Sequence, residues 1–143
     1  MPDGSHQRGL IDTSVVIDLE RVAPGELPPE LAIAAVTLAE LAAGPHATND
    51  SSERARRQER VQRAEATFDA LAFDASAARA YGRVYAEVVA SGRKPRGARA
   101  LDLLIAATAL AAGLPLYTRN PSDFDGVGDL VDVADVSTAH AGQ

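Results

Sequence analysis

Four acidic residues far apart in the chain each lie beside an apolar segment, and together they have the residue types of a cation-binding site. They are Asp12, Glu40, Asp102 and Asp123. Carboxylates gathered at one site do not all stay ionised without a counter-charge, so the site must either raise their pKa values or bind cations. Oxygen ligands without His or Cys favour Mg²⁺ or Mn²⁺ over Zn²⁺.

A site of this kind supports phosphoryl transfer or the hydrolysis of phosphodiester bonds. Two cations about 4 Å apart can activate a water and stabilise the leaving oxygen without a protein nucleophile. The sequence has no cysteine, which excludes thiol nucleophiles, thiolate zinc sites and disulfides. Its three histidines form no convincing catalytic triad. These absences favour metal-dependent hydrolysis over nucleophilic catalysis.

Each of the four acids also has a purely structural explanation. Asp12 could end a strand in a turn, Asp102 could favour the start of a helix through the helix dipole, and Asp123 stands in the common turn sequence Asn-Pro-Ser-Asp. Thr37 and Glu40 match the S/T-x-x-E capping box, which would explain Glu40 by itself. The functional interpretation therefore depends on all four acids together.

The apolar segments indicate strands that alternate with helices. The expected strands are Arg8–Ile11, 31–36, 114–118 and 130–133. Helices are expected after Asp12, from Thr37 to Gly44, over 51–71, from Asp74 onwards and over 101–112. This alternation predicts an α/β fold with a central parallel sheet and helices on both faces. The functional crevice of such a sheet lies at the carboxyl ends of its strands, where three of the four acids are expected.

The chain of 143 residues is long enough for one domain with its own core, which we expect to span residues 9–135. Residues 1–8 and 136–143 are expected to be flexible segments at either end. The first eight residues lack the apolar core of a signal peptide, and the longest uncharged run, residues 103–118, is too short for a membrane span. These features predict a cytoplasmic protein without a membrane partner.

Charge is unevenly distributed along the chain. The net charge of −6 would oppose the approach of a nucleic acid, but residues 54–99 carry a net charge of +6. The arginines of residues 54–63 are expected to form a solvated helix face, with nearby glutamates as partners. The loop that precedes Asp102 offers better candidates for binding nucleic-acid phosphates. They are Arg93, Lys94, Arg96 and Arg99.

Four short motifs, in this order, resemble those of the PIN-domain family, specifically the VapC-type toxins of bacterial toxin–antitoxin pairs. They are Leu-Ile-Asp12-Thr-Ser, Val36-Thr-Leu-Ala-Glu40-Leu, Asp102-Leu-Leu-Ile-Ala-Ala-Thr-Ala and Leu-Tyr-Thr118-Arg-Asn120-Pro-Ser-Asp123-Phe. The resemblance extends from about Gly9 to Val133. It implies an Mg²⁺-dependent endoribonuclease, with Mn²⁺ as an alternative metal, that cleaves cellular RNA and inhibits growth until a cognate VapB-type antitoxin blocks it. The resemblance also suggests a homodimer.

The resemblance assigns roles to individual residues. Asp12 and Asp102 match the principal metal-binding aspartates of the family, and Glu40 and Asp123 complete a catalytic acidic pocket. The positions that match supporting polar residues are Thr13, Ser14, Thr118 and Asn120. Some relatives have an acid where Asn120 stands, so the resemblance implies weaker binding of a second metal in this chain.

Three other α/β classes fit the sequence less well. A haloacid-dehalogenase-like phosphatase needs a second Asp where this chain has Ser14, and a receiver domain needs a lysine after a late strand, whereas the single lysine is Lys94. A Rossmann module needs a G-x-G-x-x-G fingerprint after its first strand, and that fingerprint is absent. The remaining alternative is a catalytically weak PIN-fold module that binds RNA or a protein partner.

Overall fold

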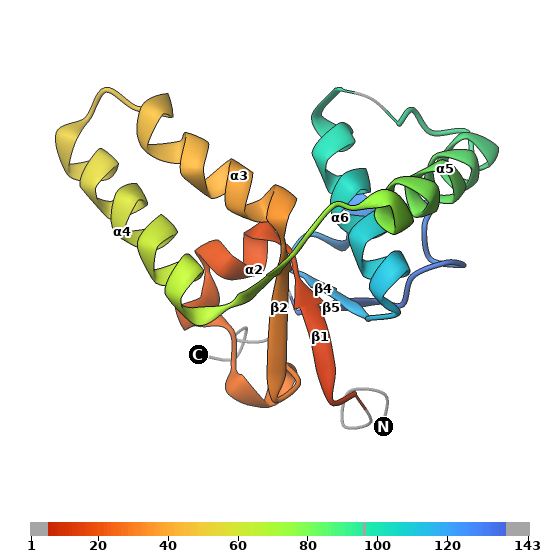
Figure 1. Ribbon diagram of the computed structural model, residues 1–143, viewed down its shortest axis with the longest axis horizontal. Helices are drawn as coiled ribbons and strands as arrows, with labels where there is room; N and C mark the ends of the chain where they lie inside the picture. The colour runs from red at the N-terminus through yellow and green to blue at the C-terminus, as the bar shows by residue number, and fades with distance from the viewer. Residues whose placement is uncertain (1–5, 96, 137–143) are drawn as a thin grey trace.

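Five short parallel strands lie at the centre of the computed structural model, which describes residues 6–95 and 97–136 (Figure 1). The strands are β1 (Arg8–Ile11), β2 (Glu30–Ala34), β3 (Asp69–Leu71), β4 (Leu116–Thr118) and β5 (Val133–Asp135). They lie in the order β3-β2-β1-β4-β5, and each neighbouring pair is parallel. Because β1 is central, its carboxyl end lies between those of β2 and β4. The sheet confirms the predicted α/β fold class.

The connections between strands are helical. The α-helices are α2 (Thr13–Ile17), α3 (Ala35–Ala43), α4 (Ser51–Thr67), α5 (Ala75–Ala90) and α6 (Ala100–Ala112). Short 3₁₀ helices are η1 (Leu19–Arg21), η2 (Pro24–Glu26), η3 (Gly44–Ala47), η4 (Gly97–Arg99) and η5 (Pro121–Phe124). Asp50 and Asp74 cap α4 and α5 by accepting hydrogen bonds from backbone N–H groups. Within the described ranges, no helix is long and apolar enough to cross a membrane.

Each face of the sheet carries its own hydrophobic cluster, because successive residues of a strand point to opposite faces. Leu10 and Leu116 pack with α5 and α6 on one face, whereas Ile11 and Tyr117 pack with α2, α3 and α4 on the other. All four side chains are fully buried. Figure 1 shows the α3–α4 pair and the α5–α6 pair on opposite sides of the sheet, which confirms the expected helices on both faces.

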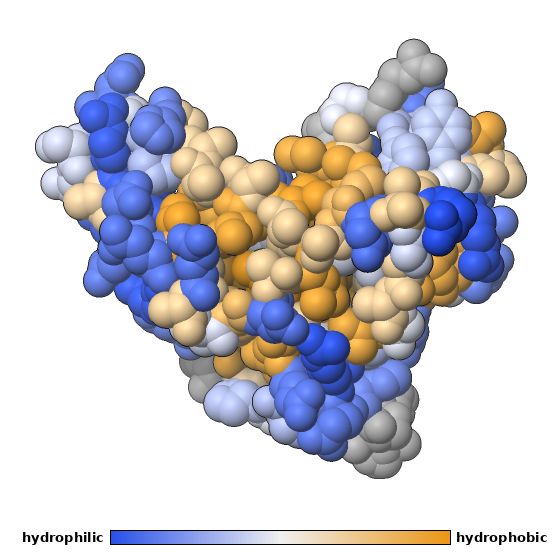
Figure 2. All heavy atoms as spheres, in the orientation of Figure 1, coloured by the Kyte–Doolittle hydropathy of each residue, from blue (hydrophilic) through white to orange (hydrophobic). Residues whose placement is uncertain are grey.

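The molecule is hollowed between these two pairs of helices. Figures 1 and 2 show this hollow in the same view, with β1 and β2 running towards it and α3 and α6 along its sides. Apolar side chains cover much of the surface seen at its base in Figure 2. The carboxyl ends of the central strands therefore open into a concave part of the surface, where ligands of parallel α/β sheets bind.

The capping box predicted at the start of α3 is wrong. The second strand ends at Ala34 and the helix begins at Ala35, without a side-chain hydrogen bond at its cap. Thr37 therefore lies in the first turn and is fully buried, and Glu40 lies in the second turn. Since Glu40 does not cap the helix, its structural explanation is removed and its carboxylate is available to the site.

Besides β2, the strands β3 and β5 differ from the sequence prediction, and β4 begins at Leu116 instead of 114. Helix α4 ends at Thr67, four residues before its predicted end, and the strand β3 (Asp69–Leu71) takes the place of its last turn. The last strand covers Val133–Asp135 instead of 130–133, because its ladder is set by pairing with β4, where Leu116 faces Val133. Leu130 and Val131 still pack against the core, but from a turn.

Replacing Gly9 by Ala is expected to destabilise the fold by about 2 kcal/mol, because it overpacks the centre of the sheet. A Cβ atom at Gly9 would lie 2.5 Å from Cε1 of Tyr117 and 3.0 Å from Cγ of Pro28. The Tyr117 ring is fully buried and has no room to move aside. Thermal unfolding would measure the loss, and an unchanged melting temperature would contradict it.

Gly82→Ala is the matched control. Gly82 lies within α5, and a Cβ there would meet nothing within 4 Å. Since alanine favours a helix over glycine by about 1 kcal/mol, this variant should be slightly stabilised.

Candidate active site

Asp12 lies at the carboxyl end of β1 and is held by three donors. Its carboxylate is 4% exposed. Oδ1 accepts hydrogen bonds from the Ser14 hydroxyl (2.6 Å) and from the backbone N–H of Val15 (3.1 Å), and Oδ2 accepts one from the Thr118 hydroxyl (2.6 Å). These donors favour the ionised carboxylate, yet burial dominates and raises the pKa of Asp12. The result is a buried carboxylate fixed in one orientation.

The hydroxyls that hold Asp12 are themselves held by the β4–η5 connection. Ser14 Oγ accepts a hydrogen bond from the backbone N–H of Arg119 (3.0 Å), and Thr118 Oγ1 accepts one from the backbone N–H of Asn120 (3.0 Å). A hydroxyl that accepts from a fixed N–H group directs its own proton elsewhere, here to Asp12. Asn120 contributes to the site through its backbone, and its side chain is exposed.

Glu40 reaches the site from α3 and is oriented by α2. Its Oε1 accepts a short hydrogen bond from the Thr13 hydroxyl (2.6 Å), and Thr13 Oγ1 lies 3.1 Å from Oγ1 of Thr37. Thr37 was not among the predicted site residues, because the expected capping box accounted for it as part of a helix cap. The feature that identifies Thr37 as a site residue is its buried hydroxyl, which lies one helical turn before Glu40.

The electrostatic centre of the site is Asp102, in the first turn of α6. The pKa of Asp102 is raised from 3.8 to about 7. Burial is the largest cause, followed by repulsion from the carboxylates of Asp123, Asp12 and Glu40, while the positive charge of Arg99 acts in the opposite direction. All four predicted acids thus act on one another at this edge of the sheet.

The four carboxylates nevertheless do not surround a single point. In residues 6–95 and 97–136, no three side chains of His, Cys, Asp or Glu form a group that could hold a metal ion. Like charges repel one another, and four carboxylates without a compensating cation are expected to stay apart. The site therefore has the charge that attracts a cation, without three side chains already arranged to hold one among the described residues.

The basic loop before α6 only partly reaches the site. Arg99 donates a hydrogen bond to the backbone carbonyl of Asp123 (2.9 Å) and so joins η4 to η5. Arg93 lies 3.6 Å from the carboxylate of Asp125, and Lys94 is exposed. Arg96, the fourth predicted phosphate ligand, lies outside the described residues. Arg99 therefore has a structural contact that the sequence did not reveal.

Replacing Thr118 by Val should weaken the site without removing an acid. The variant deletes the O–H donor to Asp12 and leaves the N–H of Asn120 without its acceptor. We expect a loss of about 1–2 kcal/mol in stability and about a tenfold loss of activity, as for other residues that orient ligands.

Thr108→Val is the control for that variant. Thr108 is equally buried, but its hydroxyl donates to the backbone carbonyl of Leu104 within α6. Assays of RNA cleavage should show normal turnover for Thr108→Val. Equal turnover by both variants would mean that Thr118 does not orient Asp12.

Comparison with known proteins now places this arrangement in a family. Residues 9–130 match the family described as the PIN domain. The chain belongs to the PIN-domain family. Among curated proteins, this PIN domain is 35% identical over 115 residues to ribonuclease VapC5 of Mycobacterium tuberculosis, covering 78% of this chain and 82% of the relative.

Solved structures agree with this assignment. This PIN domain is similar to the crystal structure of VapBC-5, a member of the VapBC family of toxin–antitoxin systems from Mycobacterium tuberculosis, with a TM-score of 0.79 and 32% identity. That match covers 92% of this chain and 100% of the other chain. FitAcB from Neisseria gonorrhoeae matches with a TM-score of 0.72 and 25% identity, covering 90% and 97% of the two chains.

Proposed function

We propose that this PIN domain is the toxin of a toxin–antitoxin pair and a Mg²⁺-dependent endoribonuclease, with Mn²⁺ as an alternative metal, that inhibits growth by cleaving cellular RNA. The observation that carries the proposal is the burial of Asp102 and its repulsion by the carboxylates of Asp123, Asp12 and Glu40, which raise the pKa of Asp102 to about 7. An uncompensated cluster of this kind attracts divalent cations. Similarity to ribonuclease VapC5 supports RNA as the substrate.

The chemistry of the donor set fits a hard divalent cation. It consists of carboxylates and hydroxyls, which are the oxygen donors that Mg²⁺ prefers. Asp12 and Asp102 are the residues that would hold it, since Asp12 is fixed by three donors and Asp102 has the least compensated charge. Bound there, Mg²⁺ would neutralise charge on the scissile phosphate and favour ionisation of a water.

The remaining acids have different roles in the proposed reaction. Glu40, oriented by Thr13, would accept a proton from the attacking water, and Asp123 would orient that water or a second cation. Attack of this water on phosphorus, with cleavage of the bond to the 3′-oxygen, would leave a 5′-phosphate and a 3′-hydroxyl. The hydroxyls of Ser14 and Thr118 hold Asp12 in one orientation and favour its ionised form.

Removing the metal should abolish cleavage reversibly. With purified protein and single-stranded RNA, we expect fragments with 5′-phosphate ends in Mg²⁺ or Mn²⁺, none in excess EDTA, and full recovery when Mg²⁺ is restored. Each state would be followed by gel analysis of end-labelled RNA and by susceptibility of the fragments to a 5′-phosphate-dependent exonuclease. Undiminished cleavage in EDTA would refute the metal-dependent mechanism.

One observation favours a second candidate function. No three acidic side chains among the described residues form a group that could hold a metal ion, which favours a catalytically weak PIN module that binds RNA or a protein partner. RNA binding without release of fragments in Mg²⁺ would support this module over the enzyme.

A cognate VapB-type antitoxin is the proposed protein partner. The similar structures include VapBC-5 and a toxin–antitoxin complex from Klebsiella pneumoniae. We also propose a homodimer in the cytoplasm. Light scattering of the purified chain, alone and with the product of a neighbouring antitoxin gene, measures both associations.

A further inference from the structure

Two adjoining grooves run along helix α4, beside the acidic site. The first, with a volume of about 410 Å³, is lined by Thr13 and Glu40 of the site and by Arg57 and Arg60 of α4. The second, of about 610 Å³, lies between α2–η1 and α4. Arg60 lines both grooves, so they meet at this side chain. A ligand that leaves the acidic site along α4 would pass Arg60.

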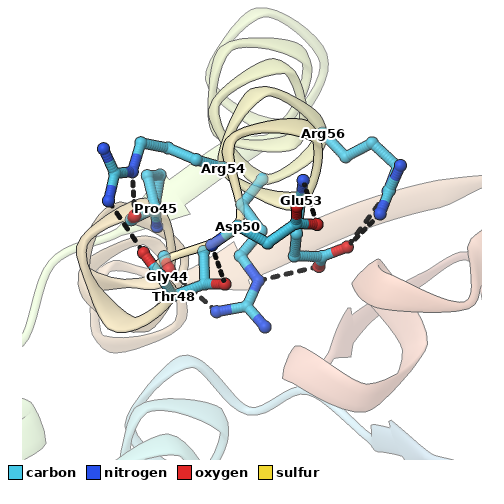
Figure 3. A network of polar contacts seen from close by, with 8 residues as sticks. Gly44, Pro45, Thr48, Asp50, Glu53, Arg54 and Arg56 are labelled. Atoms are coloured by element: carbon cyan, nitrogen blue, oxygen red, sulfur yellow. Dashed lines mark hydrogen bonds and ion pairs between the residues drawn. The ribbon is translucent and has the colours of Figure 1, made fainter.

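The other arginines of α4 are already engaged by the protein. Figure 3 shows Arg54 bound to the carbonyls of Pro45 and Thr48 and Arg56 bound to Glu53. Arg57 donates to Glu53 and to the carbonyl of Gly44, and Arg63 forms an ion pair with Glu59. The contacts of Arg56, Arg57 and Arg63 confirm the predicted glutamate partners, whereas Arg54 binds backbone carbonyls.

Arg60 differs from its neighbours, since it has no hydrogen bond or ion pair with any part of the chain that the structure describes. It is nevertheless half-buried. The residues that face it one turn away on α4 are Arg56, Arg57, Arg63 and Ala64. The glutamates of α4 that line the grooves, Glu53 and Glu59, are paired with Arg56, Arg57 and Arg63. The guanidinium of Arg60 is therefore a positive charge available to an anion.

We propose that Arg60 binds a backbone phosphate of the RNA strand, next to the scissile phosphate held at the acidic site. This inference rests on the proposed function. A nucleic acid fits better than an acidic peptide because the first groove connects Arg60 directly to Glu40, and a strand that is cut at the site must place further phosphates beyond it. A guanidinium binds phosphate oxygens through paired N–H groups.

The second groove suits the rest of a nucleotide. Val16 and Ile17 contribute an apolar wall, and the Ile17 side chain is 45% exposed. Arg56 and Arg63 line the α4 side of this groove, and Glu20, Arg21 and Glu59 line it as well. A strand lying here would place sugar or base against the apolar wall and its phosphates against the arginines, as in other single-strand channels.

Binding of a fluorescent single-stranded RNA by the full chain tests the proposal. Anisotropy would be measured at several salt concentrations, with Ca²⁺ in place of Mg²⁺ and RNA length checked after each run. We expect Arg60→Gln to raise the Kd about tenfold and to reduce the slope of log K against log salt by about 0.7, the value of one phosphate contact with a single strand. Arg60→Lys should restore most of the slope.

Arg79→Gln on α5 is the matched control, because it removes the same charge from an exposed position outside both grooves. The proposal is overturned if Arg60→Gln keeps the wild-type Kd and slope, or if Arg79→Gln has the same effect. It is also overturned if Arg60→Gln weakens only antitoxin binding, which would assign the groove to an acidic protein segment. Failure of the proposed function is distinct, since it would appear as wild-type protein that leaves RNA uncut in Mg²⁺.

Discussion

Asp12→Asn is expected to lower RNA cleavage at least a hundredfold while the protein stays folded. The substitution removes one negative charge from the proposed metal ligands, and a metal that stabilises a phosphoryl transition state contributes several kcal/mol, each 1.4 kcal/mol being about tenfold in rate. The fold should tolerate it because the asparagine has the same shape. The amide oxygen of the asparagine can still accept from the Ser14 hydroxyl and the Val15 N–H, and its NH2 group can donate to the Thr118 hydroxyl, which rotates to accept.

Initial rates of RNA cleavage in Mg²⁺ measure the effect, and circular dichroism checks the fold. Asp129→Asn is the control, because Asp129 is an exposed acid in the loop before β5 and has no part in the site. Wild-type rates for both variants would show that Asp12 does not act in the reaction.

Asp102→Asn is expected to change activity and stability in opposite directions. Cleavage should fall at least a hundredfold for the reason given for Asp12. Without metal the variant should be more stable than wild type at pH 8, by about 1–2 kcal/mol. A shift of one pKa unit corresponds to about 1.4 kcal/mol. Because the half-buried carboxylate is partly screened by solvent, the gain in stability should be smaller than the whole pKa shift would give.

The pH dependence of that gain follows from the direction of the pKa shift. The pKa of Asp102 is about 7 in the folded protein and 3.8 as an ordinary carboxyl, so folding favours the protonated form. Below pH 4 the carboxyl of Asp102 is protonated in both the folded and the unfolded protein, so it does not lower the free energy of unfolding. The cost of keeping it ionised grows from pH 4 to pH 7 and is constant above. The advantage of the neutral asparagine should therefore be small at pH 4 and largest above pH 7.

Thermal unfolding of both proteins in EDTA at pH 4.5 and pH 8 would measure this difference. Addition of Mg²⁺ at pH 8 should raise the melting temperature of wild type more than that of Asp102→Asn, because ligands stabilise the state that binds them. A variant that is less stable than wild type at pH 8 would contradict the uncompensated charge assigned to Asp102.

The main features of the fold could be predicted because long apolar runs alternate with helical patterns. Once the sheet was expected to be parallel, the rule that carboxyl ends share one edge was enough to group Asp12, Glu40 and Asp123. The position of Asp102 could be predicted from an acid in the first turn of an otherwise apolar helix. These inferences depend on segment order and periodicity, which a single sequence records directly.

Local boundaries were harder to predict because residue type did not mark them. The apolar run from Leu31 to Val36 covers both the end of β2 and the start of α3, so the Thr37–Glu40 spacing was interpreted as a cap. Strand β3 has three residues and lies at the edge of the sheet, where pairing with β2 determines its conformation. Whether Arg60 has an ion-pair partner depends on which arginines the neighbouring glutamates bind, and the sequence does not reveal this.

The most direct test of a toxin that hydrolyses RNA at this acidic site is to sequence the 5′ ends of cellular RNA after inducing wild type and Asp12→Asn side by side. We expect new 5′-phosphate ends at recurring positions, together with growth arrest, in cells that make the wild-type protein. Cells that make equal amounts of Asp12→Asn should show neither. The same new ends in both samples, or none in either, would contradict it.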